Sequence, residues 1–333
     1  MDFTLVWFTL VTLLWTGFFV LEGFDFGVGM LHGLIGRTDA ERGLAIGSVG
    51  PLWDGNEVWL VVAGASMFAA FPGWYATMFS AFYPALILLL AALIVRGVAI
   101  EYRGHRDSRR WRRNWSVLLT VGSLLAPLLI GVALGDLLRG VPIDSSQEYT
   151  GGLVDLLTPY GLYVGLTVTV LAVLHGSTFL ALKVADPVRA QAHAVSRAAA
   201  PVAAALVLGF VVWTQSLGSG WFPGVVPILA AIAAIAAAVL VHLRRDAWAF
   251  TATAVALGGT IATLFVELYP RVMVSSTNSA FDLTVQNTSS APYALKVMTV
   301  VAAVFLPLVL LYQGWTYYVF RRRLTLADVG EGL

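Results

Sequence analysis

Long apolar runs separated by short polar segments constrain the fold of this chain more than any other feature of its sequence. A helix needs about 20 consecutive apolar residues to cross the hydrocarbon core of a bilayer. Short strand-like alternation is absent, so helices rather than a barrel must satisfy the backbone hydrogen bonds. Apolar runs of sufficient length predict nine membrane-spanning helices, at about 4–32, 52–71, 76–101, 115–138, 158–183, 198–217, 222–243, 247–268 and 293–320.

The composition supports this interpretation. Hydrophobic residues make up 59% of the chain and charged residues 12%, whereas about a quarter of the residues of a soluble domain are charged. The sequence has no cysteine, which excludes disulfides, thiolate metal sites and iron–sulfur clusters. We therefore expect an all-α polytopic membrane protein that forms one integral membrane domain over residues 1–333.

Basic residues predict the orientation of the spans. If the N-terminus is outside, most of the 20 lysines and arginines fall in inner segments, including the clusters at 103–113 and 321–323. Cytoplasmic segments of membrane proteins carry such an excess. The sequence therefore predicts an outer N-terminus and a cytoplasmic tail at 321–333. It also places the long polar loop 269–292 outside, where we interpret it as a cap over a partner surface.

Charged residues lie within the first three predicted spans, toward their inner ends. Glu22 and Asp25 are three residues apart and share a helix face, and Asp54 and Glu57 repeat this spacing at the start of the second span. Arg96 lies near the inner end of the third span. A charge inside a bilayer costs at least about 2.5 kcal/mol, so these side chains should face the bundle interior, a partner or a wet cavity. We expect them to converge on one layer.

This acidic layer has two physical interpretations. In one, Arg96 neutralises a carboxylate and the ion pairs only fasten three helices together. In the other, the carboxyl groups form a proton uptake path, because buried carboxyl groups can be neutral near pH 7 and pass protons on. A single arginine cannot compensate four carboxylates, which favours the proton path. A proton-coupled transporter could use the same acids, but the paired broken helices of such carriers are not evident.

Glycines in the first span predict close helix packing. Gly23 and Gly27, and then Gly29 and Gly33, repeat the spacing that lets two helices approach each other.

Two further polar residues are given structural roles. His175 is the one histidine deep in a predicted span, and we expect it to be hydrogen-bonded across helices. Asp136 lies near the outer end of its span, where we expect a solvated carboxylate.

Several long motifs resemble those of one membrane protein family. The segments EGFDFGVGML, PLWDGNEVWL, FPGWYATMFSAFY, RGVAIEYR and GVALGDLLRGVP are similar, in this order and at these spacings, to subunit II of the cytochrome bd quinol oxidases. The similarity extends over essentially the whole chain, including the ninth predicted span.

The resemblance implies a fold and a function. The fold would be two four-helix bundles, at about 4–138 and 158–268, with a peripheral ninth helix at about 293–320. The chain would be the haem-free partner of a larger subunit I that carries haem b and haem d, in a bacterial cytoplasmic (inner) membrane. The heterodimer would oxidise quinol at the outer side and reduce O2 to water with cytoplasmic protons, electrogenically and without pumping. The resemblance leaves open ubiquinol or menaquinol, a structural quinone or lipid, and small accessory subunits.

The resemblance also assigns roles to residues. Asp54 would line a proton channel that leads toward haem d, and Glu22, Asp25 and Arg96 would correspond to the family's first-helix acidic pair and third-helix arginine. Glu57 stands where many members have glutamine, which implies an auxiliary group. No catalytic residue, metal ligand or covalently bound cofactor is implied in this chain.

Overall fold

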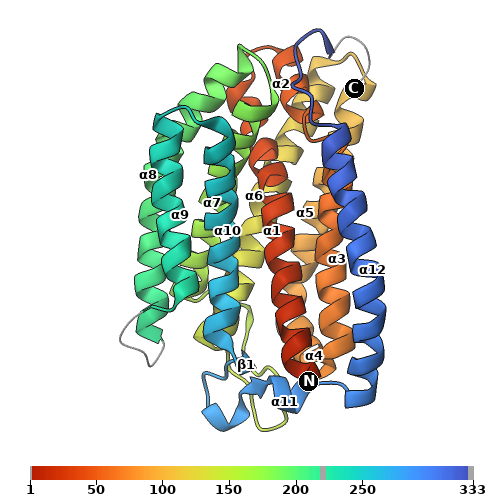
Figure 1. Cartoon of the computed structure of the whole chain (residues 1–333), viewed down its shortest axis with the longest axis vertical. Helices are drawn as coiled ribbons and strands as arrows, with labels where there is room; N and C mark the ends of the chain where they lie inside the picture. Colours follow the sequence, from red (N-terminus) through yellow and green to blue (C-terminus); the bar gives the residue numbers. More distant parts are fainter. Residues whose placement is uncertain (1, 218–222, 329–333) are drawn as a thin grey trace.

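The computed structural model describes residues 2–217 and 223–328, and helices form most of this part of the chain. The long helices are α1 (Phe3–Ile35), α3 (Trp53–Ala70), α5 (Tyr83–Tyr102), α6 (Arg109–Arg139), α7 (Pro159–Lys183), α8 (Val188–Leu217), α9 (Val225–His242), α10 (Asp246–Leu268) and α12 (Pro292–Val319), which run side by side (Figure 1). The connections contain α2 (Asp39–Gly47), α4 (Pro72–Ala81), α11 (Val285–Thr288), and an antiparallel pair of short strands, β1 (Arg271–Met273) and β2 (Leu283–Thr284).

Eight helices in the described part of the chain are long and apolar enough to cross a membrane. The long helix that does not meet this criterion is α3, because Asp54, Asn56 and Glu57 in its first turns lower its mean hydropathy. The chain is thus an integral membrane protein, and its ninth span and its orientation stay predictions. The start of the predicted span 222–243 and the end of the predicted tail 321–333 lie outside the described residues.

The predicted third span, 76–101, is not a single helix, and its first part belongs to a separate helix. Pro72 begins a separate helix, α4, which ends at Ala81, and α5 begins at Tyr83 with Pro84 in its first turn. Proline lacks an N–H group and is tolerated in a first turn, where that group has no helical partner. The two prolines therefore start two helices with a break at Phe82, instead of bending one continuous span.

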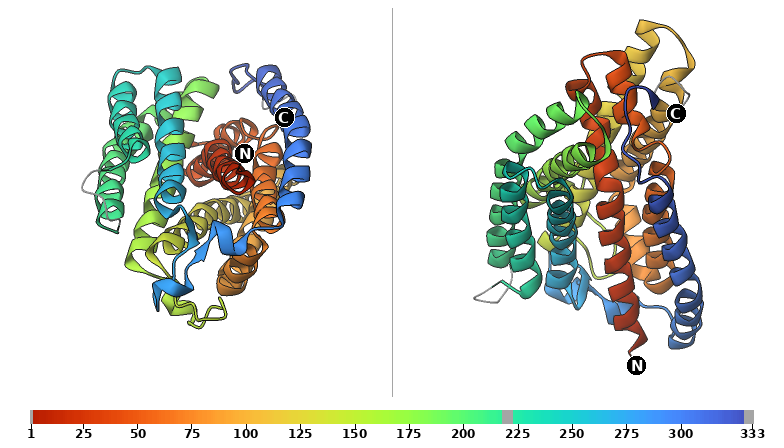
Figure 2. Two further views of the ribbon diagram at one scale, coloured as in Figure 1. Left: turned by 60° about the horizontal axis from the view of Figure 1, so that its bottom comes forward. Right: turned by 45° about the horizontal axis from the view of Figure 1, so that its top comes forward.

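The long helices form two groups. One group consists of α7, α8, α9 and α10, and the other of α1, α3, α5 and α6. From the second group, α1 packs against α7 and α10, and α6 packs against α7; α1 also contacts α3, α6 and α12 (Figure 2). α12 runs along the outside, and within this fully described helix Leu295 is the one buried residue.

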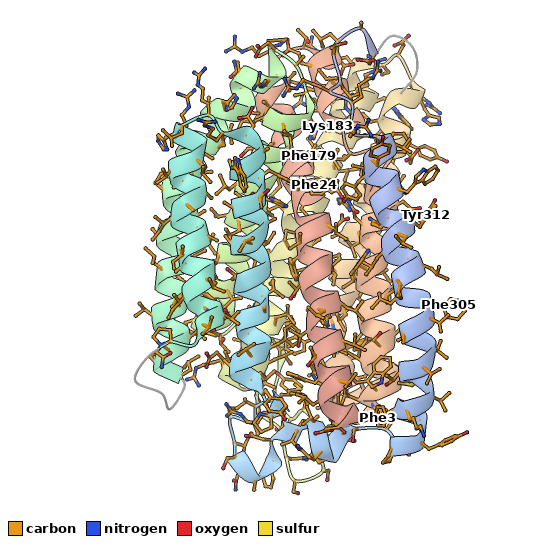
Figure 3. All side chains as sticks on the ribbon, viewed as in Figure 1. Phe3, Phe24, Phe179, Lys183, Phe305 and Tyr312 are labelled. Carbon is orange, nitrogen blue, oxygen red and sulfur yellow. The ribbon has the colours of Figure 1, made fainter. Side chains whose placement is uncertain are left out.

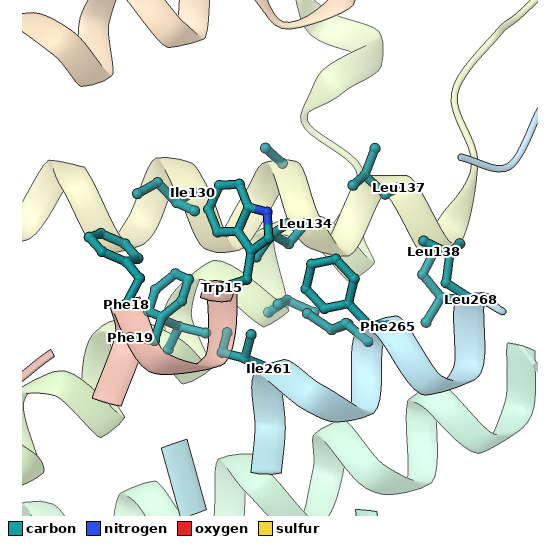
Figure 4. Close-up of a cluster of buried hydrophobic side chains, with 14 of the residues drawn as sticks. Trp15, Phe18, Phe19, Ile130, Leu134, Leu137, Leu138, Ile261, Phe265 and Leu268 are labelled. Carbon is teal, nitrogen blue, oxygen red and sulfur yellow. The ribbon is translucent and has the colours of Figure 1, made fainter. Parts of the chain in front are cut away.

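Apolar side chains of α1, α6 and α10 form the centre of the core (Figure 4). Trp15 and Phe18 of α1 lie against Leu134 of α6 and Phe265 of α10, and all four are buried. The Trp15 indole N–H contacts Met67 Sδ at 3.2 Å, which connects this cluster to α3. The core thus extends across both helix groups, which also pack directly against each other through α6 and α7.

Glycine permits a close approach between the two groups. A Cβ atom on Gly27 would collide with the carbonyl oxygen of Ala172, and one on Gly176 would lie 2.6 Å from Gly27 Cα. The expected packing role of Gly27 is therefore confirmed. The same role was wrong for Gly33, where an added Cβ would meet nothing within 4 Å.

The two ends of the bundle differ in structure and charge. At the end where α1 begins, the segment 269–292 is ordered by hydrogen bonds from the Ser276 N–H to the Val141 carbonyl and from the Ser290 N–H to the Ala70 carbonyl. Nitrogen-tipped side chains gather at the opposite end, where Lys183 is labelled (Figure 3). We call these the cap end and the basic end.

Candidate functional site

A buried ion-pair network joins α1, α3 and α5. Arg96 of α5 contacts Glu22 of α1 at 2.5 Å (Nη2–Oε1) and Glu57 of α3 at 3.1 Å (Nη1–Oε2). The side chains of Arg96 and Glu22 are fully buried, whereas that of Glu57 is 20% exposed. One guanidinium group therefore holds three helices together through two carboxylates.

A second polar contact extends this network to α12. Asn56 of α3 donates from Nδ2 to Asp25 Oδ2 at 2.7 Å and to the Leu21 carbonyl at 3.2 Å. Its Oδ1 atom accepts hydrogen bonds from Gln313 Nε2 at 2.9 Å and from the Tyr317 hydroxyl at 2.8 Å. Asn56 is fully buried, and each of its side-chain polar atoms has a partner.

The network contains more acid than base. Glu22, Asp25 and Glu57 surround a single cation, Arg96, whose guanidinium carbon also lies 4.8 Å from the centre of the Phe26 ring. Among the described residues, no N–H or hydroxyl group donates a hydrogen bond to the buried atoms Glu22 Oε2 and Asp25 Oδ1. An uncompensated buried charge is costly, and a carboxyl group avoids this cost by keeping its proton. Carboxyl groups of this network can therefore remain protonated.

Asp54 lies apart from this buried network. It is exposed in the first turn of α3, where the helix dipole favours an acidic side chain. Val58, Val61 and Phe68 continue the same exposed face of α3. The structure thus brings together Glu22, Asp25, Glu57 and Arg96. It places Asp54 nearby, on the face of α3 that points away from the bundle.

Sequence reasoning missed Asn56, which bonds to Asp25, and the two residues that bond to Asn56. Asn56 belongs to the motif that holds Asp54 and Glu57, and its place in an otherwise apolar layer was a signal for it. Gln313 and Tyr317 lie in the last helix, and no spacing in the sequence connects them to Asn56. Their contribution follows from the position of α12 against α1.

His175 has the structural role that the sequence predicted. Its Nε2 atom lies 3.1 Å from the Val20 carbonyl, its Nδ1 atom lies 2.7 Å from Thr253 Oγ1, and its ring stacks on Phe250. Both ring nitrogens are therefore engaged in contacts between helices. Across the described ranges, no group of three or more histidine, aspartate or glutamate side chains could hold a metal ion.

The expectation of a solvated carboxylate at Asp136 was wrong. Asp136 is fully buried near the cap end, and its Oδ1 atom accepts a hydrogen bond from the Thr158 hydroxyl at 2.5 Å. Thr158 also caps the start of α7 by accepting from the Gly161 N–H. The positive end of that helix compensates part of the cost of burying the carboxyl group.

The fold and the buried charges define a multi-helix integral membrane protein with an acidic network between α1, α3 and α5, and comparisons identify its family. The model of the family described as "Cytochrome bd terminal oxidase subunit II" matches residues 3–320. The chain belongs to this family, and it is accordingly a subunit of a quinol oxidase complex.

Individual relatives cover almost the whole chain. "Cytochrome bd ubiquinol oxidase subunit 2" of Bacillus subtilis is 40% identical over 325 residues, which are 96% of each protein. "Cytochrome bd-I ubiquinol oxidase subunit 2" of Escherichia coli K12 is 35% identical over 366 residues, covering 97% of this chain and 96% of the relative. Among solved structures, a chain of the bd oxidase from Geobacillus thermodenitrificans has a TM-score of 0.71 at 16% identity, over 96% of this chain and 97% of that one. This last similarity shows the fold alone.

Proposed function

We propose that this chain stabilises a haem-bearing subunit I and supplies it with cytoplasmic protons for the reduction of O2 to water, while the complex oxidises quinol. The observation that carries the proposal is the buried network in which Glu22, Asp25 and Glu57 share one cation, Arg96. Ion pairs that served only to join helices would need no excess of acid. The excess supplies carboxyl groups that can take up and release protons.

In this proposal Asp54 is the principal proton carrier. It precedes Glu57 by three residues, which is about one helical turn, so the two carboxyl groups can exchange protons through water. Glu57 is partly exposed and contacts Arg96, which connects the outer face of α3 to the buried Glu22. The buried acids and Arg96 support this path and set the charge around it.

We further propose that α3 is a ninth spanning helix and that the basic end is cytoplasmic, in a bacterial inner membrane. α3 has 18 residues, which span about 27 Å at 1.5 Å per residue, close to the roughly 30 Å of a hydrocarbon core. Its three polar residues are tolerable in a membrane because two face the network and the third lies at the helix start. The excess of basic residues at one end supports the orientation.

Subunit I would cover the apolar faces that α3 and α12 leave exposed. Val61 and Phe68 of α3 and Val304 and Leu311 of α12 are all exposed in the isolated chain. Haem b and haem d belong to subunit I in this proposal, because His175, the histidine deepest in a span, has both nitrogens engaged. Proton release toward haem d would then cross the face that carries Asp54.

Replacement of Asp54 by asparagine tests the proton role. Asparagine keeps the shape of the side chain but cannot carry a proton. In the purified complex we expect normal haem content and slowed quinol-driven O2 consumption. Loss of haem together with activity would instead support a scaffold role, and unchanged turnover would remove Asp54 from the mechanism.

Purification of the tagged chain from its native membrane tests the partner. We expect a larger subunit to copurify and to give a reduced-minus-oxidised haem spectrum. If no haem-bearing partner copurifies, the proposed role in oxygen reduction is wrong.

A further inference from the structure

A cavity rich in arginine opens at the basic end, away from the acidic network. Its volume is about 1360 Å³, and it lies where the end of α1, the helix α2 and the start of α6 meet. Seven arginines and two aspartates line it, together with one asparagine and two apolar residues: Arg37, Asp39, Arg42, Arg103, Asp107, Arg109, Arg110, Arg112, Arg113, Asn114, Val117 and Leu118. The seven arginines and two aspartates thus give the lining a net charge of +5.

The two aspartates are already paired. Asp39 forms ion pairs with Arg103 and Arg112, and Arg112 also contacts Asp107 at 2.5 Å. Arg42 is engaged as well, because its Nε–H donates to the Gly36 carbonyl at 2.9 Å. These contacts hold the walls of the cavity in place, and they pair both of its carboxylates with arginines.

Four arginines of the lining remain available. Arg37, Arg109, Arg110 and Arg113 are exposed, and no carboxylate of the described residues lies within ion-pair distance of them. They converge on one cavity from the connection that follows α1 and from the first two turns of α6. A cluster of like charges is unfavourable by itself, and an anionic ligand would relieve the repulsion. Guanidinium groups bind phosphate in a bidentate manner, which makes a phosphate group the matching ligand.

The apolar part of the lining indicates that a matching ligand would carry an apolar group beside its phosphate. Val117 and Leu118 are exposed, one turn beyond Arg113 along α6, a helix that is a candidate membrane span. Trp111, with the Arg106 guanidinium stacked on its ring at 4.5 Å, lies at the same level as the arginines. Tryptophan at a span end is typical of the membrane–water interface. The cavity therefore grades from guanidinium groups to apolar side chains at the depth of lipid headgroups.

We propose that this cavity binds the headgroup of an anionic phospholipid, with its phosphate held by Arg37, Arg109 and Arg113 and its acyl chains against Val117 and Leu118. Basic pockets between spanning helices are suited to such headgroups. The site is separate from the proposed proton path, since it contains none of the residues of the acidic network. Its occupant would join α1, α2 and α6 at the basic end and so stabilise that end of the chain.

Lipid binding by the purified complex tests this site. The variant is Arg109→Gln with Arg113→Gln, and the control is Arg244→Gln with Arg245→Gln, which removes two arginines that do not line the cavity. Each detergent-solubilised complex is titrated with phosphatidylglycerol, and separately with phosphatidylcholine and inorganic phosphate. Bound lipid is counted by mass spectrometry and stability is followed by the thermal midpoint.

We expect wild-type and control complexes to retain phosphatidylglycerol and to be stabilised by it, and not by phosphatidylcholine or phosphate. In the cavity variant the affinity should fall about 30-fold, from roughly fivefold for each arginine. If that variant fails to assemble with haem, Arg113→Lys takes its place. It keeps the charge without the bidentate geometry, so its affinity for phosphatidylglycerol should fall by a smaller factor. Unchanged retention in the cavity variants would overturn the proposal, as would equal stabilisation by inorganic phosphate. Protection of residues 109–118 from hydrogen exchange by the partner subunit in lipid-free complex would also overturn it.

Discussion

Two buried polar regions on opposite sides of α1 differ in how their polar groups are satisfied. On the side of α7 and α10, His175 lies between the Val20 carbonyl and Thr253, and both of its ring nitrogens are engaged. On the side of α3 and α5, Glu22 and Asp25 each keep a buried oxygen to which no N–H or hydroxyl group of the described residues donates. A satisfied neutral contact joins helices at small cost, whereas an unbalanced acidic network is retained at a cost to stability.

The comparison separates a structural role from a functional one. Polar groups that only join helices in a membrane need partners, and the contacts of His175 supply them. The network around Arg96 joins helices too, but it does so with an excess of carboxyl groups that the joining does not require. Variants on the two sides should therefore differ in whether they change assembly, turnover or both.

Arg96→Met should have the largest effect. It leaves Glu22 and Glu57 without their cation, and loss of one partner of a buried ion pair typically costs about 3–5 kcal/mol. We expect little assembled complex, measured as haem content per subunit II after purification. Arg96→Lys is the matched control, because it keeps the charge but cannot contact both carboxylates with one planar group. Full assembly of the methionine variant would show that the network does not join these helices.

Asn56→Leu should have the next largest effect. It removes the hydrogen bond to Asp25 and leaves Gln313 and Tyr317 of α12 without their acceptor. Each buried group left unsatisfied costs about 1–3 kcal/mol, so α12 should loosen from the bundle. Hydrogen exchange over 309–319 measures this directly. Thr316→Val is a control on the same helix, since that hydroxyl bonds to its own helix at Tyr312; equal loosening in both variants would contradict the role of Asn56.

Local patterns predicted most of the fold. Apolar runs determine the spans because each helix must satisfy its backbone within itself in a bilayer. The break at Phe82 was missed because proline is compatible both with bending a helix and with starting one, and the pattern of apolar residues is the same in both cases. α8 begins at Val188, before the predicted start at about 198, because its first turns lie outside the apolar run.

The site was predicted in part. Glu22, Asp25, Glu57 and Arg96 were found because charge in an apolar run is a strong local signal. The contact between Asn56 and Gln313 joins residues 257 positions apart, and no local signal carries that information. Asp136 was misjudged for the same reason, since its burial depends on how the start of α7 packs against the end of α6.

His175→Gln sharpens the comparison from the other side of α1. Glutamine can keep one of the two contacts, so we expect a loss of stability of about 1 kcal/mol. The haem spectrum and the quinol-driven turnover per haem should stay as in the wild type. A thermal midpoint together with O2 consumption measures both properties. A loss of turnover at normal haem content would give His175 a functional role and remove the contrast between the two regions.

Glu57→Gln should have the smallest effect on stability, and its sign is informative. Glutamine can still bond to Arg96, and the change removes one negative charge from a network with too many. Because the side chain of Glu57 is partly exposed, we expect the thermal stability of the complex to change by no more than about 1 kcal/mol, with a stabilising sign if the acids repel one another. Turnover should fall less than in Asp54→Asn, since Glu57 only assists the transfer. A larger fall than in Asp54→Asn would make Glu57, and not Asp54, the principal proton carrier of α3.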